Sequence, residues 1–323
     1  MSRFEQVDLD KVKSVSLARR RSKAEISSFA KICNSYSAKE FLNTLPKFLK
    51  ATDLVEFIER VVVARKRDFP VHLMLGAHVI KVGLSPIIID LIENRIVTGI
   101  SMNSAGLIHD LELAFIGKTS EDVAEGLRDG SFGMSALTGE WFAEVVNLAD
   151  KYSLGLGEAA GRFINERRAR YKEYSLFACA DKFNIPATVH IVIGTDIVHQ
   201  QSTFNPGLAA EASYRDFKIL ANLLIKADRG GVVANLGSAV ILPEVFLKAL
   251  TVARNLKKQK SNLTTANFDM IYHYRPMMNV VKRPTESGGR GFNFIGHHEI
   301  MIPLLAWGLK SYISAKKKQV NGE

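Results

Sequence analysis

The chain has 323 residues, of which 47% are hydrophobic and 24% are charged. This length and balance exclude a fibrous or low-complexity chain and indicate a packed globular protein with one large domain or two ordinary ones. The formal net charge is +10, but the basic residues form short local clusters without interleaved aromatic side chains, which argues against a nucleic-acid partner.

Membrane and secretion signals are missing from the sequence. No stretch reaches the roughly 18 continuous apolar residues of a membrane span, and the polar start of the chain lacks the apolar core of a signal peptide. Two cysteines are too few for a disulfide framework or a cysteine zinc cluster. We therefore expect a cytoplasmic protein that does not contact a membrane.

Residues 1–70 are predicted to form a helical N-terminal extension. Apolar side chains recur there with helical spacing over residues 38–48 and 53–66. The boundary at residue 70 is expected from this change of pattern alone, since no segment rich in proline, glycine or serine marks it.

From residue 71 onward, short apolar runs alternate with helical patterns. Such runs are typical of strands that helices cover on both faces. Strands are predicted at residues 96–102, 188–193, 231–236 and 268–274. The repeated order of strand, glycine turn and helix predicts a doubly wound α/β fold, with a mostly parallel sheet and helices on both faces, over residues 71–310. A basic C-terminal tail is expected at residues 311–323.

The turns that follow the predicted strands are candidate ligand sites. Ligands of doubly wound folds bind beyond the carboxyl ends of the strands, where glycine lets backbone N–H groups and the start of the next helix approach a phosphate. The three candidates are Asn103 to Gly106, Gly194 to Asp196, and Asn235 to Ala239. None carries the full dinucleotide fingerprint, so a glycine that merely ends a strand is the alternative interpretation of each.

Several short motifs, which occur in the right order, resemble the deoxyhypusine synthase family. Ser104-Ala105-Gly106 with His109-Asp110 is similar to the family's Thr-Ala-Gly-Gly-Val-Glu-Glu segment. The further matches are Asn184-Ile185-Pro186, Thr195-Asp196, Asn205-Pro206-Gly207-Leu208, Leu236-Gly237-Ser238-Ala239-Val240, Ser287-Gly288-Gly289-Arg290 and Pro303-Leu304-Leu305. Together these matches span residues 70 to 310.

The resemblance implies a Rossmann-type, NAD-dependent transferase that assembles as a homotetramer. Enzymes of the family oxidise spermidine and pass its aminobutyl group, through an active-site lysine, to a lysine of a protein. Acidic side chains bind the cationic substrate. By resemblance the cofactor would contact Gly76, His78, Ser104, Ala105, Gly106, Gly237 and Ser238, and the substrate would contact His109, Asp110, Asp196 and Glu244. No residue is assigned as a metal ligand, and whether the histidines bind a metal together with Asp110, Asp196 and Glu299 stays open.

The sequence departs from the family at the catalytic lysine. In the family this lysine follows Ser-Gly-Ala-Arg within a Trp-Gly-Lys triplet, whereas no lysine occurs here between Arg283 and Gly308. Lys282 is the nearest replacement. His297, His298 and Glu299 follow the glycine-rich segment and are candidate catalytic groups, because imidazole is a natural acid or base near pH 7.

Three functions stay open on the sequence. The first is an enzyme that acts on a polyamine or related cationic amine with altered chemistry. The second is a true deoxyhypusine synthase that uses Lys282. The third is a non-catalytic binding or assembly protein that keeps the fold.

Overall fold

A computed structural model describes residues 13, 26–28, 30–33, 37–258 and 261–320. Six parallel strands form one sheet in the order β3-β2-β1-β4-β5-β6. The strands are β1 (Val71–Leu75), β2 (Gly99–Asn103), β3 (Ala187–His190), β4 (Val232–Leu236), β5 (Thr264–Asp269) and β6 (Arg290–Ile295). The predicted doubly wound α/β fold is confirmed, and the strand order reverses between β1 and β4.

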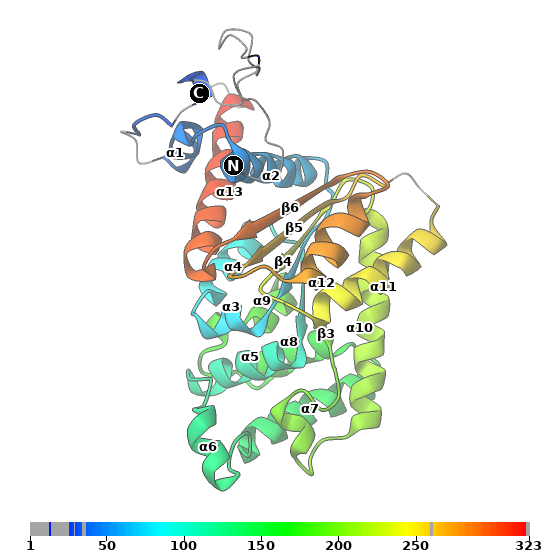
Figure 1. Cartoon of the computed structure of the whole chain (residues 1–323). Helices are drawn as coiled ribbons and strands as arrows, with labels where there is room; N and C mark the ends of the chain where they lie inside the picture. Colours follow the sequence, from blue (N-terminus) through cyan, green and yellow to red (C-terminus); the bar gives the residue numbers. More distant parts are fainter. Residues whose placement is uncertain (1–12, 14–25, 29, 34–36, 259–260, 321–323) are drawn as a thin grey trace, which may run out of the picture.

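Helices connect successive strands and cover both faces of the sheet (Figure 1). In chain order they are η3 (Ile26–Ser28), α1 (Ala38–Thr44), α2 (Leu49–Lys66), α3 (Ala77–Lys81), α4 (Ser85–Glu93), α5 (Ser104–Ile116), α6 (Val123–Asp129), α7 (Ala136–Tyr152), α8 (Leu156–Glu166), η4 (Lys172–Tyr174), α9 (Leu176–Lys182), η5 (Ile197–Gln200), α10 (Pro206–Ala227), α11 (Ile241–Leu256), α12 (Tyr274–Pro276), the π-helical segment η6 (Met277–Lys282), η7 (Arg283–Thr285) and α13 (His298–Val320).

The two faces of the sheet have separate cores. One face packs against α2, α4, α5, α9 and α13, where Phe57 of α2 contacts the rings of Phe268, Phe292 and Phe294. The other face packs against α10 and α11. Alternate residues of each strand point to opposite faces, so both cores draw on the same short strands.

Helix α2 therefore belongs to the helical layer that covers one face of the sheet, although its residues were expected in an N-terminal extension. The helix expected at 53–66 begins at Leu49, and α13 continues through the boundary expected at residue 310. Residues 1–12, 14–25 and 321–323 of the expected extension and tail lie outside the described residues.

Candidate functional site

The carboxyl edge of the sheet is tightest where the strand order reverses. The turn after β1 packs directly on the turn after β4: the N–H of Gly76 donates to Leu236, and a Cβ added at Gly76 would collide with the carbonyl oxygen of Gly237. Gly237 has a φ of +75°, which an L side chain rarely adopts. Glycine is thus required at both turns for their close approach.

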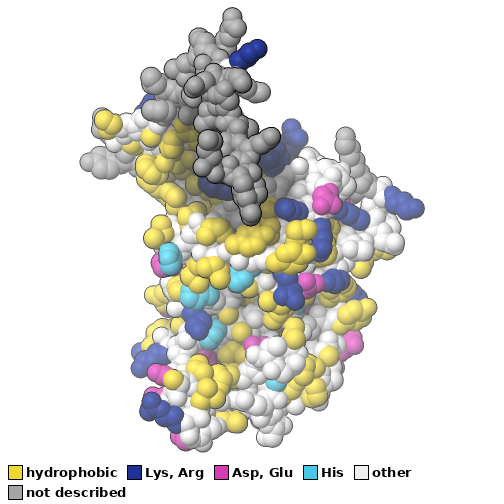
Figure 2. Space-filling model, in the orientation of Figure 1, with side chains coloured by type: hydrophobic (Ala, Val, Ile, Leu, Met, Phe, Trp, Pro, Cys, Tyr) yellow, Lys and Arg dark blue, Asp and Glu magenta, His cyan; other side chains and the backbone are white. Residues whose placement is uncertain are grey.

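Two histidine rings lie over this junction. His298, the first residue of α13, is 1% exposed, and its Nε2 would lie 2.8 Å from a Cβ added at Gly237. The ring of His78, from α3, meets it edge-on with 5.8 Å between centroids. Figure 2 shows histidine side chains grouped on this face of the molecule, between hydrophobic and basic surfaces.

A hydrogen bond to the backbone fixes which nitrogen of His298 carries the proton. Its Nε2 lies 3.4 Å from the carbonyl oxygen of Phe268, and a carbonyl can only accept, so Nε2 carries the proton. Burial lowers the pKa of His298, while Asp269 opposes that effect. The unprotonated Nδ1 is buried and has no partner among the described residues. His298 therefore presents a buried, neutral base at the junction.

Asp269, at the end of β5, is a site residue that the sequence prediction missed. It is 5% exposed; its Oδ1 accepts from the N–H of Met270 at 2.8 Å, and its buried Oδ2 has no hydrogen bond within the described chain. His273 Nε2 is 3.8 Å from that oxygen. The signal in the sequence was an acid inside the run predicted as the strand 268–274; the strand in fact ends at Asp269, and α12 begins at Tyr274.

The carboxyl ends of β2 and β3 form the other half of the edge. Ser104, at the start of α5, donates to Asp196, whose side chain also caps η5. The Nδ1 of His199 accepts from the N–H groups of Gly194 and Asp196 at 3.1 and 3.2 Å. The predicted turns at 103–106 and 194–196 are thus joined side by side.

Asp110 and Asp196 were both expected to bind substrate, and the structure places Asp110 in the interior and Asp196 at the carboxyl edge of the sheet. Asp110 is fully buried, and it accepts from the hydroxyl of Ser175 and from the N–H groups of Leu176 and Phe177. Burial raises its pKa to about 6, against the effect of these hydrogen bonds. It faces the interior of the protein from α5 and caps α9.

Glu244 and Lys282 also lie outside the junction. Glu244 contacts Lys248, Asn279 and Arg275, so its charge is already compensated by cations. Lys282 is the last residue of η6. Its neighbour Val281 places its carbonyl against Gly291, so Lys282 lies beside the first residues of β6. Lys282 therefore lies at the amino edge of the sheet, opposite His298.

Of the other predicted residues, some are exposed to solvent and some are buried within turns and helices. His297 and Glu299 point to solvent, with 68% and 50% of their side chains exposed. Gly106 is buried against Met102, and the hydroxyl of Ser238 accepts from the N–H of Leu242 within its own turn. Ala105 is half-buried in the first turn of α5.

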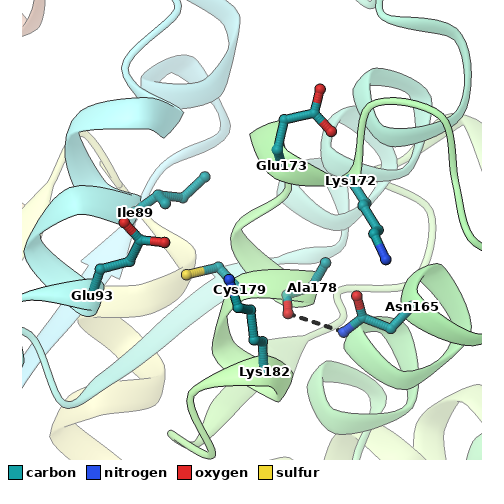
Figure 3. A pocket seen from close by; sticks show the side chains of 8 residues that line it. All are labelled: Ile89, Glu93, Asn165, Lys172, Glu173, Ala178, Cys179 and Lys182. Atoms are coloured by element: carbon teal, nitrogen blue, oxygen red, sulfur yellow. Dashed lines mark hydrogen bonds between the residues drawn. The ribbon is translucent and has the colours of Figure 1, made fainter.

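A pocket of about 240 Å³ lies elsewhere, among α4, α8, η4 and α9 (Figure 3). Cys179 and Glu93 face each other across it, and Asn165 donates to the carbonyl of Ala178. Burial and the nearby Glu93 raise the pKa of Cys179 to about 11, so the thiol is protonated and a poor nucleophile. The pocket contains none of the predicted site residues.

The described residues contain neither a cluster of metal-binding side chains nor a helix suited to span a membrane. No three histidine, cysteine, aspartate or glutamate side chains come together there as a metal site. No helix among them is long and apolar enough to cross a membrane.

Comparison with known proteins shows the fold and no more. No family model matches the chain, and no curated protein matches its sequence. Unliganded AgrE is 14% identical with a TM-score of 0.52, and AgrE in complex with ornithine and NAD+ is 13% identical with a TM-score of 0.51. These matches cover 81% and 82% of this chain but 33% of AgrE, so the chain spans about a third of that protein.

A putative deoxyhypusine synthase from Entamoeba histolytica is similar over nearly its whole length. The match covers 83% of this chain and 91% of that one, with 12% identity and a TM-score of 0.50. The fold is therefore one that a deoxyhypusine synthase-like protein shares with an NAD-binding protein.

Proposed function

We propose that this protein is an enzyme that oxidises a small cationic amine at the carboxyl edge of its sheet, with NAD as cofactor. We assign proton transfer there to imidazole groups, and no lysine-linked intermediate of the kind that deoxyhypusine synthases form takes part. The observation that carries the proposal is His298, a buried neutral base whose Nδ1 has no partner among the described residues, held over the glycine junction beside Asp269. A base that is desolvated and positioned in this way is typical of catalytic sites.

The residues at the junction fit the carboxamide of a nicotinamide ring. His298 Nδ1 lacks a donor and Asp269 Oδ2 has no hydrogen bond in the described structure. A carboxamide offers an N–H donor to the Asp269 carboxylate, which leaves His298 Nδ1 available as a base, and buried polar atoms normally have such partners. NAD, when bound, supplies a hydride acceptor. We assign Gly76, Gly237 and His78 to its surroundings.

The chain's own groups would then handle the substrate and its proton. Amine oxidation removes a hydride from carbon and a proton from nitrogen, and leaves an imine. His298 Nδ1 accepts the proton, and Asp269 stabilises the imidazolium that forms. Asp196 attracts the cationic end of the substrate at the other half of the edge. This division keeps the lysine-linked intermediate of the family out of the reaction.

The test is reduction of NAD by the full-length protein with putrescine or spermidine as the amine. We expect turnover in the wild type, a loss of roughly 10² to 10⁴ fold in His298→Asn, and a small effect in His297→Asn. His297 is the matched control because it neighbours His298 but is exposed. Equal rates in the two variants, or no binding of NAD to the wild type by calorimetry, would overturn the proposal.

A further inference from the structure

The hydrogen bonds of His109 fix which of its nitrogens carries the proton. Its Nδ1 lies 2.6 Å from the hydroxyl of Thr119, and that hydroxyl donates to Glu112 at 2.5 Å. A carboxylate only accepts, and a threonine hydroxyl has a single proton to give. The Thr119 oxygen must therefore accept from His109, which places the ring proton on Nδ1.

The other nitrogen, Nε2, is consequently a hydrogen-bond acceptor. Burial lowers the pKa of His109 to about 4; Lys81 lowers it further and Asp196 opposes this, so the ring is neutral at pH 7. Nε2 has no hydrogen-bond partner in the part of the chain that the structure describes, and 17% of the side chain is exposed. Thr138 of α7 donates to the second oxygen of Glu112 at 3.0 Å and holds the arrangement from a neighbouring helix.

We propose that His109 determines substrate specificity: its Nε2 accepts a hydrogen bond from a primary ammonium group whose charge Asp196 compensates. This inference rests on the cationic amine of the proposed function. Asp196 is tied through Ser104 to the first turn of α5, the helix that carries His109. Because Nδ1 carries the proton, Nε2 can only accept a hydrogen bond, so N–H donors distinguish one ligand from another of equal charge.

The first experiment reads the tautomer directly, without a ligand. Nitrogen-15 shifts of the histidine side chains, assigned with His109→Gln, should show Nδ1 of His109 protonated in the wild type. Thr119→Val should reduce that tautomer, whereas the control Thr119→Ser keeps the hydroxyl and should preserve it. A proton on Nε2 in the wild type would overturn the inference.

The second experiment separates charge from hydrogen bonding. Putrescine is compared with its fully N-methylated analogue, which keeps both positive charges but has no N–H donor. We expect calorimetry to show a preference for putrescine of roughly tenfold or more in the wild type. His109→Phe should abolish it, and His109→Gln, which keeps an acceptor oxygen, should retain part of it.

Unchanged preference in His109→Phe, or no binding of putrescine to the wild type, would refute the role of His109. NAD is titrated separately. Failure to bind NAD, with the preference for putrescine and its dependence on His109 intact, would refute the proposed oxidation and leave the amine site standing.

Discussion

The two halves of the sheet's carboxyl edge differ in how their polar side chains are hydrogen-bonded. At the ends of β2 and β3, Ser104 donates a hydrogen bond to Asp196. Asp196 and His199 form the capping box of η5. At the ends of β4 to β6, His298 and Asp269 are buried with polar atoms that no described residue satisfies. Buried polar atoms without partners cost free energy.

The difference indicates two kinds of site. In the β2–β3 half the Ser104–Asp196 pair is satisfied without a ligand, so it can hold an ammonium group in a preformed geometry, although Nε2 of His199 is buried there without a partner among the described residues. The β4–β6 half is incomplete by itself, so a bound group that supplies the absent partners stabilises it. Strained or unsatisfied groups of this kind concentrate at functional sites.

Crowding at the glycine junction gives the largest expected effect. Gly237→Ala adds a Cβ at a φ of +75°, 2.8 Å from Nε2 of His298. Backbone strain and displacement of a buried ring should together lower the free energy of unfolding by about 2–3 kcal/mol. Urea denaturation measures it.

Gly130→Ala is the control, because its φ is +79° but no atom lies within 4 Å of the added Cβ. It should cost only the backbone strain, about 1 kcal/mol. Equal losses in the two variants would show that His298 does not press on Gly237.

Removal of the Asp196 carboxylate from the β2–β3 half should have a smaller effect on the free energy of unfolding. Asp196→Ala deletes the cap of η5 and leaves the buried hydroxyl of Ser104 without its acceptor. We expect a loss of about 1–2 kcal/mol in the free energy of unfolding. Asp122→Ala, which removes only an exposed cap from α6, should cost less, and the reverse order would contradict the comparison.

The sequence predicted the fold well where strands are apolar and end in glycine. The strands at 96–102, 188–193 and 231–236 were found within a few residues of β2, β3 and β4. β1 was not among the predicted strands because His72 interrupts its apolar run. β6 was missed because arginine, glycine and asparagine in Arg290–Ile295 gave it the pattern of a loop.

The candidate site was harder to predict, because spacing does not reveal which side of a helix faces a ligand. Asp110 and Asp196 both follow strand-end turns, yet Asp110 lies on the interior side of α5 and caps α9. His297 and His298 are adjacent, yet one is exposed and the other buried. Packing of α5 and α13 decides both outcomes, and packing depends on residues far away in the sequence.

Besides Nε2 of His199, a further atom without a partner in the described chain lies beneath β3. Asp216 of α10 accepts from the N–H groups of Gly157 and Val189, but its Oδ1 has no partner in the described chain. Burial raises the pKa of Asp216 to about 8, against the effect of these hydrogen bonds. Between pH 7 and 8 the folded protein therefore keeps a proton that the unfolded chain has already released.

Rising pH should accordingly destabilise the protein in this window, by about 1 kcal/mol per pH unit. Asp216→Asn should remove the slope, since an amide does not titrate. Urea denaturation at pH 7 and pH 8 measures both proteins. Stability that rises with pH in the wild type, or the same slope in the variant, would show that Asp216 is ionised in the fold.

The smallest change in stability, and the opposite sign, is expected at the incomplete half. Asp269→Asn keeps the oxygen that accepts from Met270, and it replaces the unpartnered Oδ2 with an amide that can donate to His273, 3.8 Å from that position. Replacement of a buried carboxylate oxygen that has no hydrogen bond in the described structure should leave the free energy of unfolding unchanged or raise it by up to about 1 kcal/mol. NAD-dependent turnover should fall in the same variant, because the amide no longer stabilises an imidazolium at His298. Stability and activity that fall together would mean that Asp269 serves the fold, and the two halves of the edge would then differ in packing alone.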